Sequence, residues 1–162
     1  MPSIYLSPST QEFNPYIIGG NEEYYMNLIA DAMEPYLYAS GISFTRNTPD
    51  MTAASSISES NMGNYDLHLA LHSNATGSGD GTRRGSEVYY YPTSTKGKRL
   101  AGVISDNYKG LYPDPAKVTT VHNAVEPLSP ELLAVTANKP KEKVVTFLGR
   151  ITMQKGPEYF VE

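Results

Sequence analysis

The sequence predicts an α/β fold: one three-layer domain in which a twisted mixed sheet carries helices on both faces. Short apolar segments typical of strands alternate along the chain with segments whose apolar residues recur at helical spacing. The 162 residues, 40% of them hydrophobic, are enough for one domain with a buried core. We therefore expect residues 1–162 to form a single domain.

Apolar runs bounded by glycine, proline or polar residues predict the strands. They cover residues 4–6, 42–46, 66–72, 85–91 and 144–148. The run 66–72 alternates strictly, so its side chains divide between two faces. One face takes Leu67, Leu69 and Leu71, and the other takes His68, Ala70 and His72.

Helical spacing predicts one helix after Asn21, a weak one over 52–62 and another over 96–108. Asn21 can cap the first helix, and Glu22 and Glu23 then stand in its first turn, where acids are favoured. We expect Pro35 to kink or end this helix, because proline lacks the N–H group. Gly41 is a suitable end point.

Composition excludes several classes of function. The net charge of −4, without a long run of one sign, argues against binding to nucleic acid or an anionic membrane. The chain has no cysteine, so it has neither disulfides nor thiolate metal sites. No stretch reaches the ~20 apolar residues of a membrane span. The N-terminal residues do not resemble a signal peptide, so we expect the chain to be cytoplasmic as synthesised.

A transition metal would need His, Asp or Glu ligands in this chain. His72 stands at a strand end, where ligands and catalytic groups gather in α/β sheets. His68 lies roughly 13 Å away along an extended strand, so at most one of the two binds a given zinc ion. Each candidate also has a plain structural reading: a strand-end histidine can simply be hydrogen bonded, and first-turn acids simply favour the helix dipole.

The residues around His72 resemble a known family. Residues 65–75, YDLHLALHSNA, are similar to the "adl-x-i-S-i-H-x-N-A" signature of zinc amidases that cut peptidoglycan. Segments resembling "E-K-x-x-N-L", "T-R-x-x-D" and "G-x-E-V-Y-Y-Y" stand in the same order at 23–28, 45–50 and 85–91. From Ile4 to about Pro115 the chain thus resembles the catalytic domain of a zinc-dependent N-acetylmuramoyl-L-alanine amidase.

This resemblance implies a peptidoglycan hydrolase. In the family, two histidines and one glutamate hold a zinc ion, whose bound water cleaves the lactyl–L-alanine amide, and a further glutamate is the general base. Position by position, Glu23 and His72 match metal ligands, and Asn74 matches a residue that orients either the substrate or the loop. Peptidoglycan or a muropeptide is the implied partner.

The chain departs from this family at two places. The loop after the first strand has no histidine: Thr10 or Phe13 stands at that position, and Glu12 is the nearest oxygen ligand. The late strand 144–148 carries no acidic residue, so no general-base glutamate is found. We therefore expect an incomplete zinc ligand set and weak or absent amidase activity.

Residues 120–162 differ in composition and resemble a GT-B-type retaining glycosyltransferase, as a foreign or recombined segment. That resemblance implies that Arg150 and Lys155 contact a donor diphosphate. His122 reads as a loop residue of this segment, while 144–148 can complete the sheet. Two other functions therefore stand beside the amidase: a non-catalytic cell-wall-binding module and a nucleotide-sugar-binding fragment.

Overall fold

The computed structural model describes residues 1–16, 19–73, 85–122 and 145–148, and the structural statements below concern these residues. The strands are β1 Ser3–Pro8, β2 Ser43–Arg46, β3 Leu67–Leu71, β4 Ser86–Tyr90, β5 Val118–His122 and β6 Val145–Leu148. The helices are α1 Glu22–Ala39, α2 Ala53–Met62 and α3 Thr95–Lys109, with a short 3₁₀ helix η1 at Pro115–Lys117.

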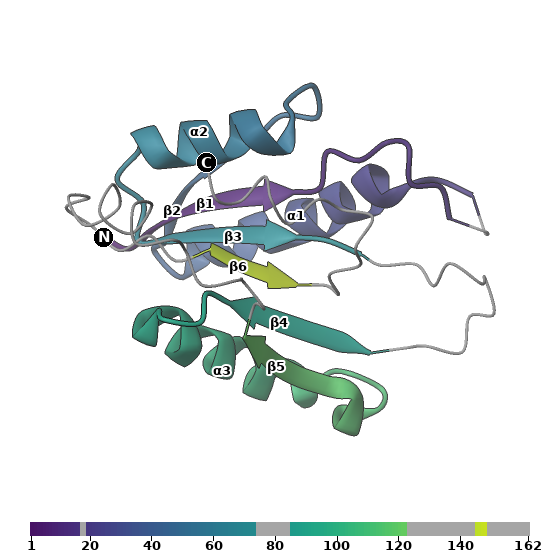
Figure 1. Ribbon diagram of the computed structural model, residues 1–162, viewed down its shortest axis with the longest axis vertical. Helices are drawn as coiled ribbons and strands as arrows, with labels where there is room; N and C mark the ends of the chain where they lie inside the picture. Colours follow the sequence, from purple (N-terminus) through teal and green to yellow (C-terminus); the bar gives the residue numbers. More distant parts are fainter. Residues whose placement is uncertain (17–18, 74–84, 123–144, 149–162) are drawn as a thin grey trace, which may run out of the picture.

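The strands form one mixed sheet in the order β2-β1-β3-β6-β4-β5 (Figure 1). The first four strands of this order, β2, β1, β3 and β6, run parallel to one another. β4 runs antiparallel to β6, and β5 is parallel to β4. The α/β fold class predicted from the sequence is confirmed.

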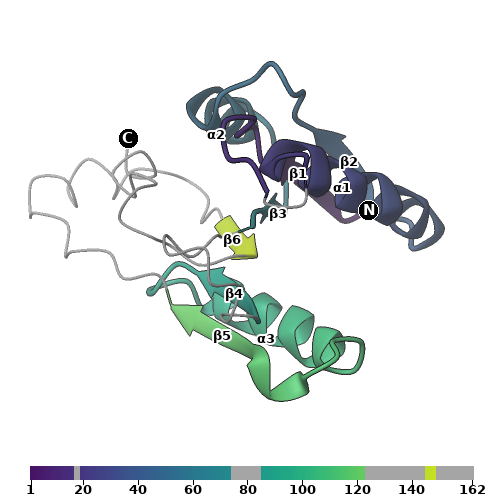
Figure 2. The same ribbon diagram turned by 90° about the vertical axis from the view of Figure 1, so that its right-hand side faces the viewer.

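Helices cover both faces of the sheet (Figure 2). One face packs against α1 and α3 through a cluster that includes Leu6, Met26, Leu69 and, from α3, Ile104. The other face meets α2, where the buried Tyr5 hydroxyl donates to the Glu59 carboxylate. The alternation of β3 sorts its side chains between these layers, as the sequence predicts: its leucines join the α1 cluster.

Helix α1 begins where the sequence predicts, because the Asn21 side chain accepts a hydrogen bond from the Tyr24 N–H at 2.8 Å. It does not end at Pro35, contrary to one of the two outcomes expected for that residue, but continues to Ala39. Pro35 is exposed, so water can satisfy the carbonyl that loses its partner. Beyond it Leu37 packs on the core, and Gly41 ends the turn in a left-handed conformation (φ +66°).

The second half of the sheet holds one strand that the sequence pattern did not predict, β5. The last predicted strand is present as β6, which lies between β3 and β4. Within the described ranges, no helix is long and apolar enough to cross a membrane.

Candidate functional site

A cluster of polar side chains lies where β1 and β3 end and α1 begins. Ser9 lies just beyond the carboxyl end of β1, and His72 lies just beyond that of β3. Parallel sheets bind ligands at these strand ends. The segment after β1 returns to start α1, and the backbone N–H of Glu22 donates to the Asn14 carbonyl at 3.0 Å. This return brings the first turn of α1 over the end of β3.

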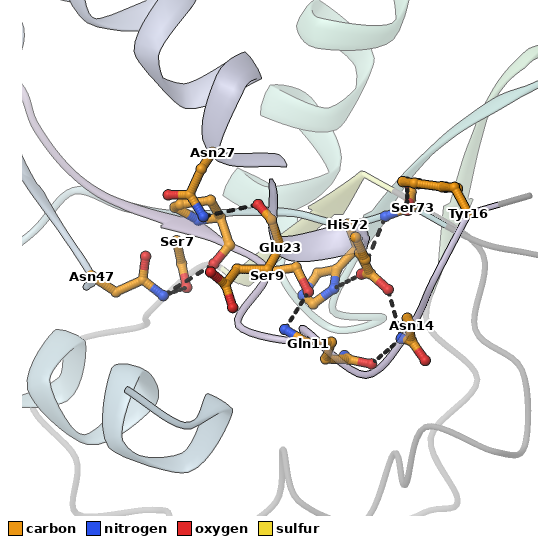
Figure 3. A network of polar contacts seen from close by, with 12 residues as sticks. Ser7, Ser9, Gln11, Asn14, Tyr16, Glu23, Asn27, Asn47, His72 and Ser73 are labelled. Atoms are coloured by element: carbon orange, nitrogen blue, oxygen red, sulfur yellow. Dashed lines mark hydrogen bonds and ion pairs between the residues drawn. The ribbon is translucent and has the colours of Figure 1, made fainter. Parts of the chain in front are cut away.

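Glu22 is the centre of this cluster. Its side chain is only 2% exposed, and both carboxylate oxygens accept hydrogen bonds. Oε1 accepts from His72 Nδ1 at 2.9 Å and from the Ser73 backbone N–H at 3.3 Å. Oε2 accepts from Asn14 Nδ2 at 2.8 Å. Figure 3 labels the three residues that donate, His72, Ser73 and Asn14, and their bonds hold the Glu22 carboxylate in a single orientation.

The contact with Glu22 fixes the role of each nitrogen in the His72 ring. An ionised carboxylate can only accept, so the proton of this hydrogen bond belongs to Nδ1. In the neutral ring Nε2 is then the acceptor and the basic nitrogen. A carboxylate that orients an imidazole in this way is the arrangement found in general bases.

Glu23, the sequence-based candidate for the metal ligand, is the next residue of α1 and is partly exposed. The structure places Glu22, rather than Glu23, in hydrogen-bond contact with His72. Burial, followed by hydrogen bonding and charge repulsion from Glu12, raises the pKa of the Glu23 carboxyl. Glu23 and Glu12 therefore form a neighbouring pair of acids, and metal binding by Glu23 remains a prediction.

His68 belongs to the core rather than to this cluster. It is 6% exposed, and its ring centroid lies 5.2 Å from that of Tyr5. Burial, followed by the contact with Glu59, raises the pKa of the Tyr5 hydroxyl. Of the two histidines of this strand, the one at its end meets an acidic side chain from α1.

Hydrogen bonds hold the segment between β1 and α1 in place around the cluster. Asn14 Nδ2 also donates to Gln11 Oε1 at 2.6 Å, and the Tyr16 hydroxyl donates to Ser73 Oγ. The Tyr16 and Tyr25 rings meet edge to face with centroids 4.8 Å apart. Burial, partly offset by the bond to Ser73, raises the pKa of Tyr16. Sequence reasoning missed Asn14 and Tyr16, because no local pattern marks a loop residue that meets another element.

A small cavity adjoins His72 on the α2 side. Its volume of about 20 Å³ has room for about one water molecule. Ser9, Asn47 and Ser56 are among its polar lining residues. Asn47 closes the end of β2 by donating from Nδ2 to the Pro8 carbonyl and to Ser56 Oγ, both at 3.1 Å.

The described residues do not fit a zinc site with three protein ligands. They contain no group of three His, Asp or Glu side chains that could hold a metal ion. The Glu22 oxygens already accept hydrogen bonds, and His72 Nδ1 is directed at one of them. Asn74, Arg150 and Lys155 lie outside the described residues, so their expected roles are neither supported nor opposed.

His122 does not supply a third metal ligand beside Glu22 and His72. It ends β5, three strand positions from β3, and this half of the sheet runs in the opposite direction. With roughly 4.8 Å between neighbouring strands, the two strands are about 14 Å apart. His122 therefore lies in the edge strand β5, three strands away from the strand that His72 follows.

No protein-family model and no curated protein sequence matches this chain. Solved structures do match. The N-acetylmuramoyl-L-alanine amidase AmiC2 of Nostoc punctiforme has a TM-score of 0.64 at 15% identity, with 90% of this chain and 77% of that chain covered. The N-acetylmuramoyl-L-alanine amidase from Clostridium difficile 630 has a TM-score of 0.64 at 16% identity, covering 90% and 80%.

A third match covers a larger share of both chains. The amidase Ami1 from Mycobacterium smegmatis gives a TM-score of 0.60 at 13% identity and covers 99% of this chain and 90% of its own. The likeness therefore extends beyond Pro115, where the sequence resemblance stops. No glycosyltransferase segment emerges from these comparisons, so that resemblance stays a prediction. At such identities the likeness establishes the architecture: the chain has an α/β fold like that of N-acetylmuramoyl-L-alanine amidase catalytic domains.

Proposed function

We propose that this chain recognises the muramoyl-peptide part of peptidoglycan at the carboxyl ends of β1 and β3, as an amidase-type hydrolase with a low rate of turnover. One observation carries the proposal: in a fold like that of amidases, a carboxylate from the start of α1 and an imidazole from the end of β3 meet at 2.9 Å. The bond in question is the lactyl–L-alanine amide, which the sequence resemblance implies.

In this proposal His72 does the chemical work that the described residues allow. Glu22 orients the ring through Nδ1 and stabilises the imidazolium that forms when Nε2 takes a proton. Nε2 accepts a hydrogen bond from a water molecule beside the amide, takes its proton as the water attacks the carbonyl carbon, and returns that proton to the leaving nitrogen as the C–N bond breaks. The cavity next to His72 is large enough for one such water.

The low rate follows from what surrounds this pair. Hydrolysis of an amide needs stabilisation of the negative charge that develops on the carbonyl oxygen. A metal ion is one source, and the described residues contain no group of three His, Asp or Glu side chains that could hold one. This observation also favours the second candidate function, a wall-binding module that holds muropeptides without cleaving them.

A paired binding and turnover experiment tests the proposal. Calorimetry with muramyl dipeptide gives the affinity, and mass spectrometry with and without added zinc gives the released peptide. The key variant is His72→Asn, whose amide nitrogen can replace Nδ1 in the bond to Glu22 but has no counterpart of Nε2. Glu23→Ala is the matched control on the same helix turn.

We expect the wild-type chain to bind the ligand with slow release of peptide, and His72→Asn to lose at least about tenfold in affinity, or ~1.4 kcal/mol. Glu23→Ala should bind like the wild type. Binding without any release selects the wall-binding module. Absence of binding by the folded wild-type chain overturns the proposal, and rapid turnover with zinc overturns its statement on rate.

A further inference from the structure

The Asn14 side chain lies beside the Glu22 carboxylate and is hydrogen bonded to it. Its Nδ2 donates one hydrogen bond to Glu22 Oε2 at 2.8 Å and another to Gln11 Oε1 at 2.6 Å. An amide nitrogen has two protons, so both are used by these acceptors. The backbone joins the same residues, because the Glu22 N–H donates to the Asn14 carbonyl. Asn14 and Glu22 are thus fastened to each other by main chain and side chain.

The contact of the other carboxylate oxygen, Glu22 Oε1, with His72 is a hydrogen bond, and its length differs from the distance between two ligands of one zinc ion. Two ligand atoms at ~2.0–2.1 Å from one tetrahedral zinc ion lie about 3.3 Å apart, and neither needs a proton between them. His72 Nδ1 and Glu22 Oε1 are 2.9 Å apart, which is a hydrogen-bond distance with a proton on Nδ1. The same oxygen accepts from the Ser73 N–H at 3.3 Å.

We infer that Asn14, Glu22 and His72 form a metal-free site, in which Asn14 and His72 each donate a hydrogen bond to one oxygen of the Glu22 carboxylate. Asn14 is a positioning residue: it fixes the carboxylate, which in turn orients His72. To take up zinc between Glu22 and His72, the site would have to give up the hydrogen bond between Glu22 Oε1 and His72 Nδ1, and the described residues offer no third protein ligand in return. This inference concerns the metal alone, so it stands or falls independently of peptidoglycan binding.

The inference also assigns the loop position that governs metal binding. A histidine at position 14 would place an imidazole next to Glu22 Oε2 and would remove the competing donor. The sequence comparison puts the missing histidine at Thr10 or Phe13 instead. Phe13 is the immediate neighbour of Asn14, yet this residue is 73% exposed. The variants Asn14→His and Phe13→His therefore add the same group to adjacent residues with opposite expectations.

Zinc chloride titrated into the purified chain, in competition with a chromophoric chelator, tests this assignment. We expect the wild-type chain to bind zinc no more tightly than about 10 μM, Asn14→His to bind at least about tenfold more tightly, and Phe13→His to match the wild type. Thermal unfolding with equimolar zinc should likewise shift only for Asn14→His. A wild-type site with submicromolar affinity that His72→Asn abolishes would overturn the inference, as would a gain confined to Phe13→His.

The wild-type titration decides the matter even if Asn14→His does not fold. Histidine side-chain NMR signals of the wild type provide the second reading. If zinc at one equivalent leaves the His72 signals in place, the metal-free site is supported. If those signals move or broaden stoichiometrically, the ion is entering the site and the inference is wrong.

Discussion

Replacing Glu22 with alanine should destabilise the fold far more than replacing its neighbour Glu23. The Glu22→Ala variant leaves three donors without their acceptor: His72 Nδ1, the Ser73 N–H and one proton of Asn14 Nδ2. Each partly buried donor left in this way costs about 1 kcal/mol, so together they cost about 3 kcal/mol. Loss of an acid from the first turn of α1 adds about 0.5 kcal/mol.

Out of a typical stability of about 5–15 kcal/mol, this is a large fraction, and it corresponds to a fall in melting temperature of about 10 °C for a chain of this size. Urea unfolding followed by circular dichroism near neutral pH measures it. Glu23→Ala removes the same charge one residue later and should stay within about 0.5 kcal/mol of the wild type. Equal losses for the two variants, or a larger loss for Glu23→Ala, would refute the assignment of Glu22 as the buried acceptor.

Three further outcomes follow from contacts elsewhere. Arg46→Ala removes the guanidinium that donates to Asp31, Glu34 and Asn27. The free energy of unfolding, measured in urea, should fall by about 1–2 kcal/mol. Arg46→Lys should recover only part of this loss, because one ammonium group cannot make all these bonds. Because the folded state raises the pKa of Tyr5, the unfolded chain loses this proton first and stability falls as pH rises above about 10. Tyr5→Phe should therefore flatten the alkaline part of the stability profile, and a profile with an unchanged slope would count against the buried hydroxyl. The raised pKa of Glu23 likewise means that stability falls as pH rises through the ordinary glutamate range near 4–5. Glu12→Gln should therefore be more stable than the wild type near pH 7 and equal to it near pH 3, whereas a variant that is less stable at neutral pH would contradict the repulsion.

Periodic features of the sequence predicted much of the fold. The alternation over 66–72 placed the leucines of β3 in the α1 cluster and His68 on the opposite face, because successive side chains of a strand point to opposite sides. Asn21 predicted the start of α1, because its side chain can satisfy a helix N–H group. β5 was missed, because its five residues follow a proline-rich turn and depend on pairing with β4.

The site was harder to predict, because its geometry depends on single-residue register. Consecutive residues of a helix point about 100° apart, so a choice between Glu22 and Glu23 selects a different side of α1. Motif comparison chose Glu23, whereas the cap at Asn21 places Glu22 against His72. Asn14 carried no signal in the sequence, because its role comes from a loop that folds back onto α1. His72 lies in this cluster, at the strand end where the sequence puts it, and its role as a metal ligand stays a prediction.

The state of the His72 ring in the folded wild-type chain is the most direct test of the account. Nitrogen-15 NMR of the histidine side chains distinguishes a proton on Nδ1 from one on Nε2 without perturbing the site. The account predicts a protected, strongly downfield Nδ1–H signal for His72 that persists in Glu23→Ala and disappears in Glu22→Ala. A neutral His72 ring with its proton on Nε2, and no hydrogen-bonded Nδ1–H, would contradict the pairing of Glu22 with His72 on which the site depends.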